Sequence, residues 1–342
     1  MTTPTDDRGD NYLWDRSDPV DPSVADLERR LAPLAYDAAA RPLVLKRPHR
    51  RLRAMVLTGA IAASLVLAVG LWYYHWRLAW PANHAWTMVV SEASPWAPVK
   101  PGQLGVGEAL ALQAPASAHI DVARLGTIDA TPGTELTVSA TESQHHRVQM
   151  TKGSVEVRLW APPGAVAFRT PAGDVIDLGC RFMLTVDPQG LAFLTVRTGW
   201  VELDNAYGES LVPAGASSAM QADRRPLVPV YDDAAPEFLN AVRAFERADS
   251  DPADRLLRTV TMTKVVRTRD VLTLLLLAAR QQGPARADLV AAAASLVPPP
   301  AGVTVSAVNS DDDALWKWVD ALALPPVKGW WRNWRDALPR LK

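Results

Sequence analysis

The sequence has little cysteine and no excess of charge of either sign. Its 342 residues include one cysteine, Cys180, so an internal disulfide and a zinc site built on paired thiolates are both excluded. The 36 basic and 37 acidic side chains nearly cancel, so no overall field favours nucleic acid as a direct partner. The length exceeds that of a usual single domain, which predicts at least two folded units.

Motifs of catalysis and metal binding are also missing. No serine lies in a nucleophile elbow, and GQLGVG at 102–107 lacks the spacing of a dinucleotide loop. His145 and His146 are adjacent in a polar stretch, which predicts an exposed hairpin tip, and the acidic run at 311–313 predicts a helix cap rather than a calcium loop. We therefore expect no catalytic residue, metal or cofactor, and a buried structural role for Cys180.

One long apolar run is present, at residues 54–74. Its 21 residues carry no charge, which matches the length of a helix that crosses about 30 Å of hydrocarbon. Aromatic residues crowd its C-terminal end, and such rings prefer the headgroup layer of a membrane. This pattern predicts a single transmembrane helix over 54–76, with interfacial residues Arg50, Arg51, Arg53, Trp72, Tyr73, Tyr74, Trp76 and Trp80.

The basic residues predict the orientation of that helix. Six arginines and lysines lie between residues 41 and 53, whereas only Arg77 follows the run before Lys100. The positive-inside rule then places the N-terminus in the cytoplasm and residues 77–342 in the periplasm of a bacterial inner membrane. The run begins too late in the chain for a cleaved signal peptide.

The tail at 1–53 contains a predicted amphipathic helix. Asp21 and Pro22 are suited to the N-cap and first position of a helix. Apolar residues then recur at helical spacing, and 53 residues cannot bury such a stripe well, so it packs weakly on itself, pairs with a second copy or docks on another protein. The candidate partner-binding residues are Leu13, Trp14, Val24, Leu27, Leu31 and Leu34.

The pattern of apolar and polar residues changes after the predicted transmembrane helix. Residues 77–100 contain prolines without a clear period and are predicted to be a juxtamembrane linker. Residues 101–230 alternate apolar and polar side chains in short runs, with a turn signal about every ten residues. This pattern predicts a mainly β domain, either a β-sandwich, a roll or a short β-helix.

The C-terminal third changes again to helical spacing. Residues 231–324 are predicted to be a small all-α region, in which the nine-residue run at 271–279 is too short to cross a bilayer and is expected to form helical core. Residues 325–342 combine tryptophan with basic side chains. Together with Trp316 and Trp318, these tryptophans either lie at a membrane interface or cover the helical core.

Several phrases of the β region resemble a known family. They are LGVGEALAL, then TPAGDVIDLGCRFMLTVD, LTVRTGWVEL, LVPAGASS and VYDDAAPEF, in this order between residues 104 and 238. This sequence resembles the FecR family of membrane-anchored regulators. The tail segment at 12–34 and LVPPPAGVTV at 296–305 are similar to a subgroup of FecR-domain proteins.

The resemblance implies a β-rich periplasmic domain that receives a signal from a periplasmic or outer-membrane receptor protein. It also implies a cytoplasmic tail that controls an ECF-type sigma factor. The tail here holds only Trp14, whereas related tails carry several tryptophans.

Two hypotheses of function follow. In the first, the chain is a transmembrane signal transducer that controls a sigma factor. In the second, it is a membrane-anchored structural or interaction protein whose β domain binds an envelope component. Titratable groups are not concentrated anywhere with an evident role, so we do not expect an enzyme.

Overall fold

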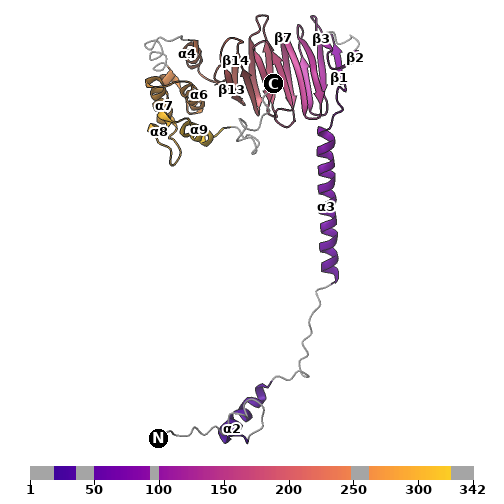
Figure 1. The fold of residues 1–342 in the computed structure, drawn as a ribbon, viewed down its shortest axis with the longest axis vertical. Helices are drawn as coiled ribbons and strands as arrows, with labels where there is room; N and C mark the ends of the chain where they lie inside the picture. Colours follow the sequence, from indigo (N-terminus) through magenta and orange to yellow (C-terminus); the bar gives the residue numbers. More distant parts are fainter. Residues whose placement is uncertain (1–18, 36–49, 93–99, 248–261, 325–342) are drawn as a thin grey trace, which may run out of the picture. The chain divides into compact units, whose positions relative to one another are not determined.

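The computed structural model describes residues 19–35, 50–92, 100–247 and 262–324 (Figure 1). The chain divides into two compact units, Met1–Val69 and Gly70–Lys342. The predictions for Leu13, Trp14 and residues 325–342 lie outside the described residues.

The first unit contains the predicted tail helix, α2 at Pro22–Leu31, followed by a 3-10 turn at Ala32–Leu34. Asp21 is its N-cap, with a side chain that accepts a hydrogen bond from the Ser23 N–H at 2.8 Å, and Pro22 is the first helical residue, as predicted. A longer helix, α3 at Arg50–Leu78, begins in this unit and ends in the next without a break.

In the described residues, fifteen strands build the β domain. Their bounds are β1 Trp86–Ser91, β2 Lys100–Leu104, β3 Ala109–Ala111, β4 Ser117–Val122, β5 Gly126–Ala130, β6 Glu135–Glu142, β7 His145–Leu159, β8 Val166–Thr170, β9 Gly173–Asp177, β10 Arg181–Val186, β11 Ala192–Thr198, β12 Trp200–Asn205, β13 Gly208–Pro213, β14 Ala216–Met220 and β15 Val230–Tyr231.

The strands form two sheets that share the long strand β7. The first sheet runs β2-β1-β4-β5-β7-β10-β11-β14-β15, and the second runs β3-β6-β7-β8-β9-β12-β13. All pairs are antiparallel except β7 with β8. The strand changes sheets near Gly153, because its earlier part pairs with β6 up to Lys152 and its later part pairs with β10 from Gly153 onward.

The two sheets face one another across a common apolar core. The Phe168 ring of the second sheet meets the Phe182 ring of the first edge to face, with centroids 5.9 Å apart. The alternating residues that predicted the strands are buried in this core, among them Ile120, Val138 and Leu203. Of the predicted architectures, a β-sandwich, a roll or a short β-helix, two facing sheets correspond to the β-sandwich.

The predicted linker at 77–100 is wrong over residues 86–91. These residues form β1, which pairs on one side with β2 and on the other with β4, so it lies inside the first sheet. Trp86 is completely buried. Prolines near the segment suggested a linker, but its own WTMVVS run is free of proline and suits a strand.

The helical region consists of α4 Pro236–Arg247, α6 Val271–Ala278, α7 Pro284–Leu296, α8 Val305–Ser310 and α9 Asp312–Ala321, with a 3-10 turn at Thr268–Asp270. As predicted, α6 is buried helical core and the Asp311 side chain caps α9. Helix α7 begins at Pro284, because proline fits the first turn of a helix.

Candidate functional site

The apolar stripe of the tail helix α2 has no cover within the described part of its unit. Leu27, Leu31 and Leu34 are 56%, 51% and 78% exposed, and Val24 is half-buried. On the opposite side of the helix, Arg29 pairs with Asp26 at 3.1 Å. Among the described residues the side chains of the stripe are thus exposed, and its binding of a partner stays a prediction.

Helix α3 carries the predicted membrane segment. Its residues Gly59–Leu78 are long and apolar enough to cross a membrane by length and composition, and no residue of their most apolar stretch is buried. The predicted interfacial ring residues Trp72, Tyr73, Tyr74 and Trp76 lie in the last two turns and are 44% to 65% exposed. Arg50, Arg51 and Arg53 lie in the first turn, where side chains fall outside the described residues.

The C-terminal end of α3 is held by the β domain. Leu78, the last helical residue, is only 7% exposed and belongs to the same core as Trp86. Arg124, in the turn between β4 and β5, donates from Nη1 to the carbonyl oxygens of Trp76 at 2.7 Å and of Ala79 at 2.9 Å. Carbonyls at a helix C-terminus lack partners within the helix, so this guanidinium caps α3 and favours its dipole.

Cation–π contacts add to this junction, which is called below the joint between α3 and the β domain. The Arg124 guanidinium lies 4.3 Å from the centroid of the Trp76 ring and 5.5 Å from that of Trp80. On the other side, the Arg77 guanidinium lies 3.8 Å from the centroid of Trp160, which follows β7 and remains 63% exposed. Sequence reasoning missed Arg124 and Trp160, because each comes from a turn far along the chain with no local signal.

The hairpin between β6 and β7 fixes the residues that follow the helix. The Trp80 N–H donates to Ser143 Oγ at 3.0 Å, and Ser143 Oγ donates back to the Trp80 carbonyl at 3.1 Å. The Asn83 N–H donates to the Thr141 carbonyl at 2.8 Å. Residues 80–83 are thereby fastened to the β domain rather than forming a loose linker.

A buried polar group lies beneath that hairpin. Trp86 Nε1 donates to Thr141 Oγ1 at 2.9 Å, and the same hydroxyl is hydrogen-bonded to His146 Nδ1 at 2.9 Å. His146 is completely buried, so the prediction of an exposed histidine tip is wrong for it; the strand alternation of β7 turns it inward while His145 stays half-buried. Burial, followed by the nearby His145 and Arg147, lowers the pKa of His146 to about 4.

Two of the segments that carry the family resemblance, DLGC and GWVEL, meet at one buried turn. In DLGC, the Cys180 N–H donates to Asp177 Oδ1 at 3.0 Å, and its thiol donates to the same oxygen. Gly199 of the GWVEL phrase packs against this turn, since a Cβ there would lie 2.7 Å from the Gly179 carbonyl oxygen. Cys180 is buried as predicted, and these residues secure the fold rather than expose reactive groups.

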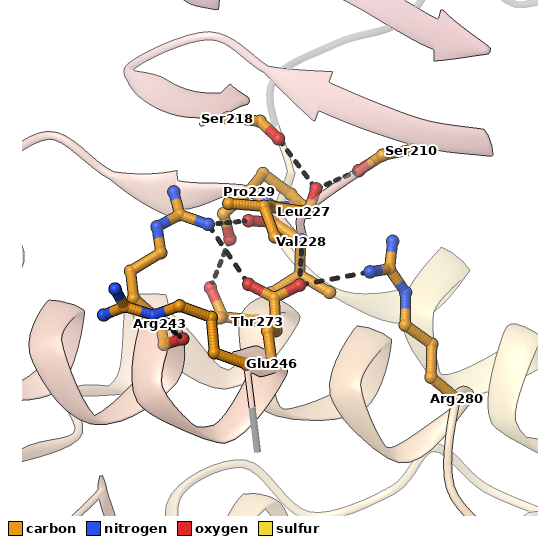
Figure 2. Close-up of polar contacts among 10 residues, drawn as sticks. Ser210, Ser218, Leu227, Val228, Pro229, Arg243, Glu246, Thr273 and Arg280 are labelled. Atoms are coloured by element: carbon orange, nitrogen blue, oxygen red, sulfur yellow. Dashed lines mark hydrogen bonds and ion pairs between the residues drawn. The ribbon is translucent and has the colours of Figure 1, made fainter. Parts of the chain in front are cut away.

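A second polar cluster fastens the helical region to the β domain (Figure 2). Glu246 of α4 accepts from the Val228 N–H at 2.7 Å and from Arg280 at 3.1 Å, and its other oxygen accepts from Arg243 at 3.2 Å. Its side chain is 6% exposed, and burial raises the pKa of the Glu246 carboxyl while the two arginines oppose the shift.

The segment 227–229, which contains Val228, is held by three further hydrogen bonds. Ser210 and Ser218, on β13 and β14, both donate to the Leu227 carbonyl, at 2.8 and 2.7 Å, and Thr273 of α6 donates to the Pro229 carbonyl at 2.8 Å (Figure 2).

Among the predicted C-terminal tryptophans, Trp318 is fully buried in the helical core, as one of the two interpretations expected. Within the described part of the chain, no group of three or more metal-ligating side chains is placed to hold an ion.

Comparison with known proteins adds little to this geometry. No protein-family model matches the chain. No curated protein matches it either. Two crystal structures of a "putative anti-sigma factor" from Parabacteroides distasonis ATCC 8503, at 1.65 and 2.50 Å resolution, are similar to it at 17% identity over 40% of this chain. The match spans 65% and 64% of those chains with a TM-score of 0.32 in each case, which is too low to argue for a shared fold or function.

Proposed function

We propose that this chain is a single-pass regulator of the bacterial inner membrane, similar to the FecR family. In this proposal its N-terminal tail is cytoplasmic and residues 77–342 are periplasmic. The periplasmic part receives a signal from a periplasmic or outer-membrane receptor protein, and the tail controls an ECF-type sigma factor.

The observation that carries this proposal is the joint between α3 and the β domain. Leu78 lies in the core of the β domain, and Arg124 caps the last turn of the helix. A helix whose end belongs to a folded domain moves with that domain, whereas one joined by a loose linker does not. The joint therefore suits a protein that passes a change in its outer domain along the helix.

The exposed stripe of α2 supports the cytoplasmic half of the proposal. Leu27 and Leu31 of α2 and Leu34 of the following 3-10 turn form one apolar face, and none of the residues of α2 is buried. An amphipathic helix of this kind binds by laying its apolar face in a groove of a partner. The family resemblance of the chain names a sigma factor as that partner.

Site-specific photocrosslinking in living cells tests the proposal on the full-length chain. A photoreactive residue at Leu31 should crosslink to a sigma factor, whereas one at Arg29, on the opposite side of α2, should not. The variant Leu27→Asp/Leu31→Asp should alter transcription of the genes under that sigma factor, and Arg29→Asp should leave it unchanged.

Two results would count against sigma-factor control. One is recovery of the same proteins from both crosslinking positions. The other is unchanged transcription with Leu27→Asp/Leu31→Asp when the protein is present at normal levels. Either result would favour the second hypothesis, a membrane-anchored protein that binds an envelope component.

A further inference from the structure

A cavity of about 390 Å³ lies between the sheet and the helical region, beside the Glu246 cluster. Strands β11 and β14 and helix α4 line it, together with the segment that connects β14 to β15. Its volume is within the range of small-molecule sites, roughly 300 to 1,000 Å³. None of the residues around it takes part in the proposed signalling joint.

The charge of this cavity is one-sided. Its lining includes four arginines, Arg224, Arg225, Arg243 and Arg247, and one carboxylate, Glu246. Arg243 and Arg280 already neutralise Glu246, so that carboxylate is not available to balance the remaining cations. A cation would be repelled from such a site, and an anion would be attracted.

Two of these arginines have no carboxylate partner among the described residues. Arg224 pairs with Asp223 at 3.2 Å. For Arg225 and Arg247, in contrast, no described residue places a carboxylate within ion-pairing distance; the Arg247 Nε donates only to the Arg243 carbonyl, at 3.0 Å. A guanidinium binds carboxylate and phosphate groups with two parallel hydrogen bonds, so these side chains can hold either group.

The rest of the lining is apolar. Phe193 is 48% exposed, which leaves a large ring uncovered on the outer side of β11, and Leu191 and Leu227 are half-buried near it. The hydroxyls on this side are occupied: Ser218 donates to the Leu227 carbonyl, and Thr195 is hydrogen-bonded to Ser217 at 2.9 Å. Recognition here therefore combines guanidinium groups with an apolar wall.

Because β11 and β14 pair with each other along this wall, their backbones offer no free edge to an added peptide strand. A small molecule that lies across the side chains fits better. We propose that this cavity binds a small amphiphile with one anionic headgroup, a carboxylate or a phosphate, and an apolar chain. The headgroup binds Arg225 and Arg247, and the apolar chain lies against Phe193.

Calorimetric titration of the full-length protein in lipid nanodiscs tests this inference, with empty nanodiscs as the blank. Sodium decanoate is the probe, and decanol and inorganic phosphate each supply one half of its chemistry. We expect saturable binding of decanoate at one site, with decanol and phosphate each at least about tenfold weaker.

Variants locate the site. Arg225→Gln/Arg247→Gln should weaken decanoate binding at least about tenfold, and Phe193→Ser should weaken it as well. The control Arg158→Gln/Arg181→Gln removes the same charge from exposed arginines that pair with Glu156 outside the cavity, and it should bind decanoate as the unaltered protein does. Thermal unfolding of each variant establishes that it is folded.

The inference is overturned if decanoate shows no saturable binding above the blank, or if both double variants bind it equally. If phosphate binds as tightly as decanoate, the apolar chain does not contribute to binding, and the proposal of an amphiphilic ligand is wrong. Because binding is measured on the purified protein, these outcomes are independent of what the tail contacts in cells.

Discussion

Arg124 Nη1 lies 2.7 Å from the carbonyl oxygen of Trp76, so a turn of the β domain caps a helix that begins 74 residues earlier in the chain. The same nitrogen reaches the Ala79 carbonyl, and the guanidinium rests on the rings of Trp76 and Trp80. One side chain therefore secures both the last turn of α3 and the first residues after it.

Replacing this arginine should loosen the end of the helix. Hydrogen bonds from a charged donor contribute about 1.5 to 3 kcal/mol, so Arg124→Ala should speed amide exchange of residues 77–80 by at least about tenfold. Hydrogen exchange with mass spectrometry measures this change. Arg158→Ala, an exposed arginine on β7, is the control, and equal exchange in the two variants would contradict the capping role.

The proposed orientation predicts which residues a membrane-impermeant maleimide can reach. The only natural cysteine, Cys180, is buried, so its background labelling should be low. In spheroplasts, Tyr207→Cys in the β domain should be labelled at once, whereas Leu34→Cys in the tail should be labelled only after the membrane is permeabilised. Both positions are well exposed, at 56% and 78%. The reverse pattern would place the N-terminus outside.

Burial of His146 predicts a loss of stability in acid. Its folded pKa of about 4 is below the ordinary value of 6.5, so the unfolded chain binds more protons between these values. The free energy of unfolding should therefore fall as the pH drops from about 6.5 to about 4, by at most on the order of 3 kcal/mol from this group.

Chemical denaturation at several pH values measures this loss. His146→Gln should reduce the dependence on pH, whereas His145→Gln, at the half-buried neighbouring position, should largely retain it. An identical pH dependence in the unaltered protein and His146→Gln would show that His146 is not its source.

We expect substitution of Gly153, at the point where β7 changes sheets, to lower the free energy of unfolding strongly. It has a φ of 103°, and a Cβ there would lie 2.3 Å from the Thr134 Cα, which is backbone and cannot move aside cheaply. Gly133 has a φ of 85° but open space around it, so Gly133→Ala measures the conformational cost alone, about 1 to 2 kcal/mol.

Gly153→Ala should therefore destabilise the protein by about 2 kcal/mol more than Gly133→Ala, or prevent its accumulation. Thermal unfolding and the yield of folded protein compare the two variants. Equal stability would mean that the strands can separate at this point without loss.

The sequence determined those features that depend on local periodicity. The uncharged run at 54–74, the cap formed by Asp21, the alternation in strands such as β10 and the helical core at Val271–Ala278 are each encoded within a few neighbouring residues. Hydrophobic period and capping chemistry act over one or two turns of backbone, so they can be recognised without a fold.

Tertiary structure alone decided the joint at Arg124, the inward turn of His146, the place of β1 within a sheet and the arginines gathered around one cavity. Each joins residues from distant parts of the chain, and nothing in the neighbouring sequence marks them as partners. Their positions follow from strand pairing and from packing of the helices on the sheet, which bring together side chains that the sequence keeps far apart.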